Sequence, residues 1–262
     1  MSLTCKGFDL IIVMGSLLSR SDASAVAKMQ ACMQEGAKLI YLFTMEDAEF
    51  SAKSDFFSRY EVGSEEGVLA LLAKAFLEKE DCPEALKDYF DNLDEGYLSA
   101  ERNLGEEEIE EIQALYAQSK GVLLWLGEDV LSHPQADNCL LLAHAIATHS
   151  HHAVVYGGDA SIVPFHKPLE EVAPLKSYDG TVVYQCMKQH DEDAIVIGSA
   201  QFKVAAKVQD GDKIVVTFEN EVYPCTFVHD DSLKGTIALM PVASQPQQYP
   251  YRVAKIVKAD VQ

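Results

Sequence analysis

Eight histidines are the first side chains in this sequence that could perform chemistry, and three of them, His149, His151 and His152, lie close together. A zinc site would need such imidazoles on one helix face together with a further ligand, and the HExxH pattern is absent. Histidines in the last turn of a helix also interact favourably with the helix dipole. The cluster therefore favours a helix-capping or solvated role, and we predict no metal ligand.

His133 and Pro134 follow Gly127-Glu128-Asp129 and indicate a loop and then a helix start. A catalytic role for His133 is the alternative. Carboxylates are so numerous in this acidic chain that spacing alone selects no general acid and base. We therefore assign no catalytic residue.

The first strand offers another candidate site. Phe8–Met14 is a continuous apolar run, followed by Gly15-Ser16 and a helix whose N-terminus could hold an anion. A plain strand-to-helix turn explains the same residues. The fingerprints GxGxxG, GxxxxGKS/T and GxSxG are absent, so no Rossmann dinucleotide site, Walker site or nucleophile elbow is supported. No acid closes the second strand either, because Leu39–Phe43 ends in Phe43.

The elements that must position these residues alternate between strands and helices over residues 8–156. Continuous apolar runs predict buried strands, and apolar residues three and four apart behind capping residues predict helices. This alternation is typical of an α/β fold with a parallel, Rossmann-like sheet and flanking helices. The predicted strands are Phe8–Met14, Leu39–Phe43, Phe57–Val62, Gly121–Leu126 and Ala153–Tyr156, and the predicted helices are 22–35, 64–77, Pro83–Phe90, Leu93–Glu101, Gly105–Gln118 and Ala136–Thr148.

Near Gly157 the pattern changes, and glycines and prolines with little periodicity mark a connector. Beyond it, β-branched residues and turn signals predict a small C-terminal β-barrel of roughly 80 residues. We therefore divide the chain into an α/β domain (1–156), the connector (157–180) and the barrel (181–262). The strands predicted in the barrel are Thr181–Gln185, Ala194–Ile197, Lys203–Ala206, Lys213–Glu219, Glu221–Val228, Thr236–Met240 and Tyr251–Val257.

The net charge limits the partners. The 262 residues include 41 acids and 21 bases, which gives a formal charge of −20. A field of this sign repels phosphate backbones and anionic lipids, so we expect no nucleic-acid partner. We also expect no direct membrane insertion, because the longest apolar stretch, Leu10–Leu18, is too short to span a bilayer. Acids at helix starts, such as Glu65-Glu66 and Glu106–Glu108, are expected to form a solvated surface.

The six cysteines form no CxxC pair, so neither a zinc ribbon nor a locally ligated iron–sulfur cluster is supported. Scattered single cysteines are typical of reduced, mostly buried thiols in a cytosolic protein. A secreted disulfide framework is the less favoured alternative.

The order of these elements resembles the molybdopterin oxidoreductase superfamily. Phe8–Ser16 resembles the superfamily's strand and turn aDlilviGsNP, Gly36–Ile40 its strand GaklivvDPR, and Val62-Gly63-Ser64-Glu65 its segment PGTDxALL. In the barrel, Asp210-Gly211-Asp212 and Lys234-Gly235-Thr236 are similar to the superfamily's pterin-dinucleotide-binding domain, a double-psi β-barrel. The resemblance covers nearly the whole chain.

Within that superfamily, Gly127-Glu128-Asp129 with His133-Pro134 is similar to GEDlxxHPxA, a pattern of the large iron–sulfur subunit of bacterial NADH-quinone oxidoreductase (respiratory complex I). The resemblance implies the C-terminal part of that large subunit, with iron–sulfur clusters in N-terminal domains that are missing here. It also implies other subunits of the respiratory complex as partners and a cytoplasmic location, peripheral to the inner membrane.

Two departures from the superfamily's motifs bear on cofactor binding. Leu17-Leu18 replaces Asn-Pro after the first strand, and Phe43-Thr44-Met45 replaces Asp-Pro-Arg after the second. In the pterin enzymes those polar positions help to hold the dinucleotide. We therefore expect a vestigial cleft and no cofactor bound by this chain. The residues of this cleft are Gly15, Ser16, Phe43, Gly63 and Ser64.

The function predicted from this resemblance is a structural, non-catalytic part of the complex that transfers electrons from NADH to quinone. Two alternatives stay open. One is a fragment of an active molybdopterin-dependent oxidoreductase that binds the pterin dinucleotide, and the other is a stand-alone acidic binding module.

Overall fold

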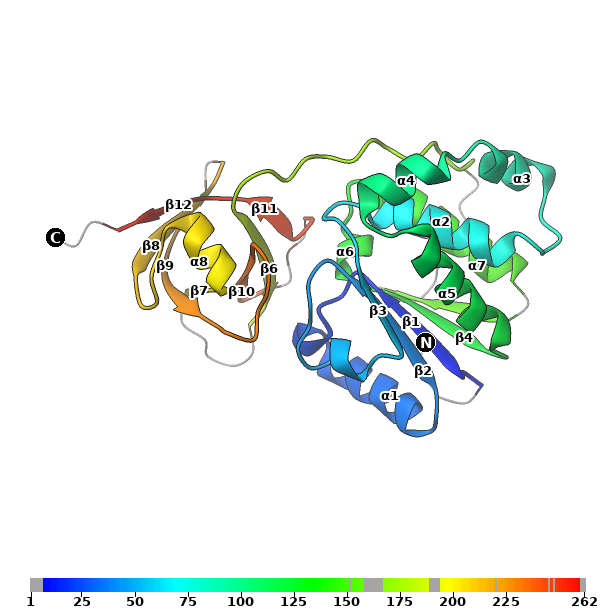
Figure 1. Ribbon diagram of the computed structural model, residues 1–262, viewed down its shortest axis with the longest axis horizontal. Helices are drawn as coiled ribbons and strands as arrows, with labels where there is room; N and C mark the ends of the chain where they lie inside the picture. The colour runs from blue at the N-terminus through cyan, green and yellow to red at the C-terminus, as the bar shows by residue number, and fades with distance from the viewer. Residues whose placement is uncertain are drawn as a thin grey trace. The chain divides into compact units, whose positions relative to one another are not determined.

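The computed structural model describes residues 7–150, 152–157, 167–188, 194–219, 221–244, 246 and 248–259. The chain divides into two compact units (Figure 1). Unit 1 consists of Met1–Ser16, Asp22–Thr44 and Phe50–Leu175, and unit 2 of Leu17–Ser21, Met45–Glu49 and Lys176–Gln262.

Unit 1 is built on a five-stranded parallel sheet with the strand order β3-β2-β1-β4-β5. The central strands β1 and β4 are buried along their whole length, as their continuous apolar sequences predict. The predicted parallel, Rossmann-like sheet is therefore confirmed. Its strands are β1 (Leu10–Met14), β2 (Lys38–Phe43), β3 (Phe56–Arg59), β4 (Val122–Leu126) and β5 (Ala153–Tyr156).

Helices flank this sheet on both sides, with α1 on one side and α2, α5 and α7 on the other (Figure 1). Helix α2 is buried on nearly every side, because its sequence is apolar all round and α4, α5 and α7 pack against it. The helices of unit 1 are α1 (Ala23–Gln34), α2 (Glu65–Leu77), α3 (Glu84–Asp91), α4 (Glu95–Arg102), α5 (Glu106–Gln118), α6 (Glu128–Leu131) and α7 (Ala136–His149).

Local sequence signals explain where several of these elements begin and end. Asp22 caps α1 by accepting a hydrogen bond from the Ala25 amide at 2.7 Å. Gly36 follows that helix with φ +102°, the left-handed conformation that a glycine adopts without strain. Helix α6 differs from our prediction, which made residues 127–134 a loop. One helical turn forms there because Gly127 begins it in an extended conformation and its carbonyl accepts from the Leu131 amide.

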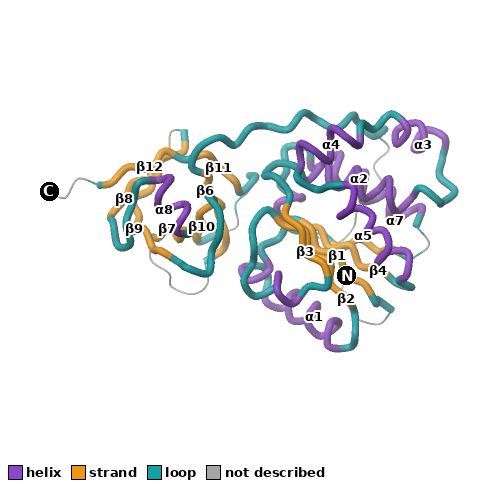
Figure 2. The backbone as a smooth tube through the Cα atoms, in the orientation of Figure 1, coloured by secondary structure: helices purple, strands orange, loops and turns teal. Residues whose placement is uncertain are grey.

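Unit 2 is a curled, seven-stranded mixed sheet with the order β11-β6-β10-β7-β9-β8-β12, which is consistent with the predicted small barrel (Figure 2). The pairs β6–β10 and β7–β9 are parallel, and the other pairs are antiparallel. The strands are β6 (Val182–Met187), β7 (Ile195–Gly198), β8 (Lys213–Phe218), β9 (Glu221–His229), β10 (Ile237–Val242), β11 (Tyr251–Val253) and β12 (Lys255–Lys258).

One strand prediction in this unit is wrong. Residues Lys203–Ala206 belong to a helix, α8 (Ala200–Ala206), and not to a strand. The helix forms because Ser199 accepts the Phe202 amide at 3.1 Å as an N-cap, while Phe202 is inserted into the core of the sheet. The predicted strand Tyr251–Val257 is also interrupted, since Ala254 bonds to Thr181 and separates β11 from β12.

Of the cysteines that the structure describes, Cys82, Cys139, Cys186 and Cys225 are buried free thiols, as expected. Cys32 departs from that expectation, because it is disulfide-bonded. Across the described part of the chain, no helix has the length and apolar character needed to cross a membrane.

Candidate functional site

The carboxyl ends of β1 and β4 form the point where the strand order of the sheet reverses, which is where open α/β sheets bind ligands. Gly15 and Ser16 lie at this point and are already engaged. The Ser16 hydroxyl donates to the Glu128 carboxylate at 2.9 Å, and the Gly15 carbonyl accepts from the Asp129 amide at 3.0 Å. An anion entering this turn would therefore meet the Glu128 carboxylate.

The end of β2 is apolar. Phe43 has no exposed surface, and its ring stacks on that of Tyr41 with 5.9 Å between the centroids. The Tyr41 hydroxyl donates to the Ser16 carbonyl at 2.9 Å, which ties the ends of β1 and β2 together. Leu17 and Leu18, the other departures from the superfamily pattern, are buried as well. Aromatic and aliphatic side chains therefore occupy the positions at which the superfamily's motifs have polar residues.

Gly63 and Ser64 precede α2. Gly63 has φ +85°, and its carbonyl accepts a hydrogen bond from His133 Nε2 at 3.1 Å. Ser64 is the N-cap residue of α2, but its side chain makes no cap bond. Its hydroxyl is buried and has no hydrogen-bond partner among the described residues.

The acids at the start of α2 are buried, which corrects our prediction of a solvated helix start. Glu65 is 0% and Glu66 3% exposed, and Asp129 is also fully buried. The prediction failed because His133 and the segment 170–173 cover this end of the helix, and contacts so distant in sequence leave no periodicity. By contrast, Glu106 and Glu107 at the start of α5 are exposed as expected.

The His133 side chain, which precedes α7, makes polar contacts with the residues at the beginning of α2. The Gln135 amide donates to His133 Nδ1 at 3.0 Å, so the ring proton is on Nε2, which faces Gly63 and lies 3.6 Å from Glu65 Oε2. Burial lowers the pKa of His133, and the positive charge of Arg102 lowers it further. The hydrogen bond to the Gly63 carbonyl raises the pKa, but the lowering is larger. The ring is therefore held neutral at pH 7.

Cys139 lies beside this histidine, with its sulfur 3.9 Å from His133 Nδ1. Burial raises the pKa of the Cys139 thiol well above its ordinary value, and the charges of Glu65 and Glu66 add to the effect. Because the thiolate is the nucleophilic form, this pair does not make an activated cysteine. The alternative of catalysis by His133 gains no support from its surroundings.

We expect protonation of His133 to destabilise unit 1. Because its folded pKa is depressed, the folded state binds fewer protons than the unfolded state near pH 6.5, so stability rises with pH through this range. Urea unfolding should give a smaller free energy at pH 5.5 than at pH 7.5, and the variant His133→Gln should narrow that difference. An equal difference in wild type and variant would contradict this account, and His144→Gln, at a half-buried position of α7, is the matched control.

Three buried side chains from different helices form a polar group that we call the clamp: Glu66 of α2, Arg102 of α4 and Asn138 of α7. Asn138 Nδ2 donates to Glu66 Oε1 at 2.8 Å. Burial raises the pKa of Glu66, while its hydrogen bonds and the nearby Arg102 charge oppose that shift. The Arg102 side chain packs directly against α2 at Gly67, where an added Cβ would be 1.7 Å from its Nε.

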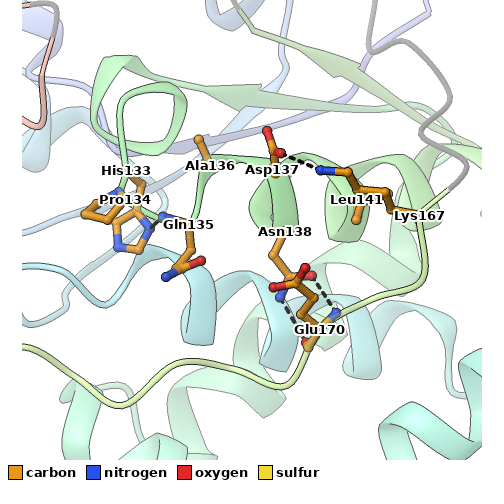
Figure 3. Close-up of a pocket in the computed structure, with 9 residues that line it drawn as sticks. All are labelled: His133, Pro134, Gln135, Ala136, Asp137, Asn138, Leu141, Lys167 and Glu170. Atoms are coloured by element: carbon orange, nitrogen blue, oxygen red, sulfur yellow. Dashed lines mark hydrogen bonds and ion pairs between the residues drawn. The ribbon is translucent and has the colours of Figure 1, made fainter.

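A cavity of about 320 Å³ lies beside the clamp (Figure 3). Two of its charged groups are paired with each other, since Lys167 donates to Asp137 at 3.1 Å. Its lining residues are His133, Pro134, Gln135, Ala136, Asp137, Asn138, Leu141, Lys167 and Glu170. Unit 2 has a second cavity of about 550 Å³, lined by residues that include Tyr223, Cys225 and Met240. Within the described ranges, no three histidine, cysteine or carboxylate side chains gather in a way that could hold a metal ion.

Sequence reasoning missed the clamp. Arg102 and Asn138 carry no motif, and Glu66 was interpreted as a surface acid. The signal that could have found it is Gly67, because an isolated glycine inside a strongly helical sequence indicates a close approach by another group.

The buried hydroxyl of Ser64 gives a second prediction. Replacing an unpartnered buried hydroxyl by hydrogen removes no hydrogen bond, so Ser64→Ala should change the free energy of unfolding by less than about 0.5 kcal/mol. The matched control is Ser199→Ala, which removes the N-cap of α8 and should cost about 1 kcal/mol. Urea unfolding measures both. A loss for Ser64→Ala as large as for Ser199→Ala would show that the Ser64 hydroxyl has a partner.

Comparisons with known proteins bear on the fold. No family model matches the chain, and no curated protein matches its sequence. Among solved structures, acetylene hydratase from Pelobacter acetylenicus is similar, with a TM-score of 0.61 and 7% sequence identity. The match covers 92% of this chain and 71% of that one. At such low identity the likeness concerns the fold alone.

Proposed function

We propose that this chain is a structural, non-catalytic part of the peripheral arm of a bacterial respiratory NADH-quinone oxidoreductase, comparable to the C-terminal part of its large iron–sulfur subunit. The observation that carries the proposal is the filled end of the sheet. Phe43 is fully buried against Tyr41, and the Ser16 hydroxyl is bonded to Glu128. A chain with this fold, in which its own side chains fill the carboxyl ends of the strands, is suited to supporting neighbouring domains.

The residues at these strand ends do not fit a pterin dinucleotide. The diphosphate of such a cofactor needs free donors at a turn or helix N-terminus. Here the Glu128 carboxylate lies at the β1 turn, and Gly15 contacts the α6 start so closely that a Cβ on Gly127 would be 2.1 Å from the Gly15 carbonyl oxygen. The Ser64 hydroxyl is the one vestigial-cleft side chain without a partner in the described residues. We therefore derive no reaction step through this cofactor.

Pterin content tests the first half of the proposal. The chain would be produced in a bacterium that makes the pterin dinucleotide, and any bound pterin would be released, oxidised and measured by its fluorescence. We expect a content near background, while a molybdopterin enzyme purified in parallel serves as the positive control. Near-stoichiometric pterin would support instead the alternative of a fragment of an active molybdopterin oxidoreductase, which the likeness to acetylene hydratase favours at the level of fold.

Association with the respiratory complex tests the second half. The chain would be mixed with the purified peripheral arm of a bacterial NADH-quinone oxidoreductase whose large iron–sulfur subunit lacks its C-terminal part. We expect the chain to co-elute with the arm on size exclusion at micromolar concentration. Elution as a separate species would favour the third possibility, a stand-alone acidic binding module.

A further inference from the structure

The connector between the units includes an extended segment, residues 169–173, that we call the strap. It has no helix or strand of its own, and none of its residues is fully buried. Leu169 and Val172 pack against the core of unit 1. Beyond the strap, unit 1 continues to Leu175, and unit 2 resumes at Lys176.

The clamp binds the strap through its backbone. Asn138 pairs with both backbone groups of Glu170, accepting its amide at 3.0 Å and donating to its carbonyl at 3.0 Å (Figure 3). Glu66 accepts the Ala173 amide at 2.9 Å, and Arg102 donates to the Ala173 carbonyl at 3.2 Å. Every backbone donor and acceptor of Glu170 and Ala173 is thus bonded to a side chain of the clamp.

The spacing of these contacts has a period of three residues. Leu169 and Val172 turn toward the core, and Glu170 and Ala173 present their backbone to the clamp. Three residues per turn is the period of polyproline II, a conformation without internal hydrogen bonds. A segment of this kind, flanked by Pro168 and Pro174, depends for its order on the groups that hold it from outside.

We propose that the strap is a releasable latch, which detaches from the clamp as a unit while the rest of unit 1 stays folded. Four hydrogen bonds and two partly buried side chains hold it, far fewer contacts than hold α2 or α7. Release opens the backbone groups of Glu170 and Ala173 to solvent.

Hydrogen exchange on the full chain tests the latch. We expect the amides of Glu170 and Ala173 to exchange faster than the amides of α2 and α7. The variant Asn138→Ala removes both bonds to Glu170 and should accelerate the strap amides about 10- to 100-fold. Ala173→Pro removes the strap amide that donates to Glu66 and leaves the clamp side chains and the core unaltered. It should also accelerate the exchange of the other strap amides. Asp137→Ala, which breaks the exposed ion pair to Lys167, is the matched control and should have little effect.

Two results would overturn the proposal: strap amides that exchange only together with those of α2 and α7, or variants whose strap exchange equals that of wild type.

Discussion

Replacing Arg102 by methionine is expected to lower the free energy of unfolding by about 1.5–3 kcal/mol, because it removes a charged donor to a backbone carbonyl and a nearby positive charge that favours the Glu66 carboxylate. Arg102 is 1% exposed and its positive charge opposes the rise in the pKa of Glu66, which is 3% exposed. Removal of the guanidinium also deletes the bond to the Ala173 carbonyl. Urea unfolding followed by circular dichroism measures the loss.

A double variant separates the charge from the loss of packing. Arg102→Met combined with Glu66→Gln removes both charges, and it should recover at least half of the stability lost in the single variant. Lys87→Met is the matched control, because its ion pair with Asp81 is exposed and should contribute less than about 1 kcal/mol. If the double variant is less stable than Arg102→Met alone, the buried pair does not act through its charges.

The second large effect is expected at Gly127, where β4 gives way to α6. An added Cβ would lie 2.1 Å from the Gly15 carbonyl oxygen and 2.4 Å from the Ser16 Cβ. The backbone angles, φ −82° and ψ −177°, are open to alanine, so the cost arises from contact alone. Because backbone atoms cannot move aside as a flexible side chain can, Gly127→Ala should cost about 3 kcal/mol in thermal or urea unfolding.

Gly96→Ala is the control for this substitution. Gly96 lies inside α4, and its nearest neighbour to an added Cβ is 3.8 Å away. Alanine there should stabilise the protein by about 0.5–1 kcal/mol, because glycine is the poorer helix former. A neutral effect of Gly127→Ala would mean that the turn after β1 and the α6 start can separate, and the filled edge of the sheet would then be less rigid than the proposed function requires.

The fold of unit 1 was predictable from the sequence because its strands are buried on both faces. Phe8–Met14 and Gly121–Leu126 are apolar without interruption, a pattern that a helix at the surface would not show. The strand predicted at Lys203–Ala206 failed for the opposite reason. A seven-residue helix has too few turns to show the apolar periodicity of a helix in its sequence. Its N-cap, Ser199, lies outside the range that was predicted as a strand.

The candidate site was predictable only in part. The departures at Phe43 and at Leu17-Leu18 could be identified in the sequence, and all three side chains are buried. The clamp and its contacts to the strap could not be predicted, because residues 66, 102, 138 and 170–173 are brought together only by tertiary structure. Its one acid, Glu66, has the same type and local spacing as solvated acids elsewhere in the chain. Only burial distinguishes Glu66 from Glu106.

The two last strands of unit 2 have a consequence for how that unit is made. β11 pairs with β6 and β12 pairs with β8, so consecutive residues near the end of the chain cover both outer strands of the curled sheet. Until residue 258 has left the ribosome, β6 and β8 present unpaired backbone groups that can template pairing with another chain. The nascent unit therefore depends on residues 251–258 for protection against aggregation, and chain termination just before Tyr251 would leave a species suited to chaperone capture.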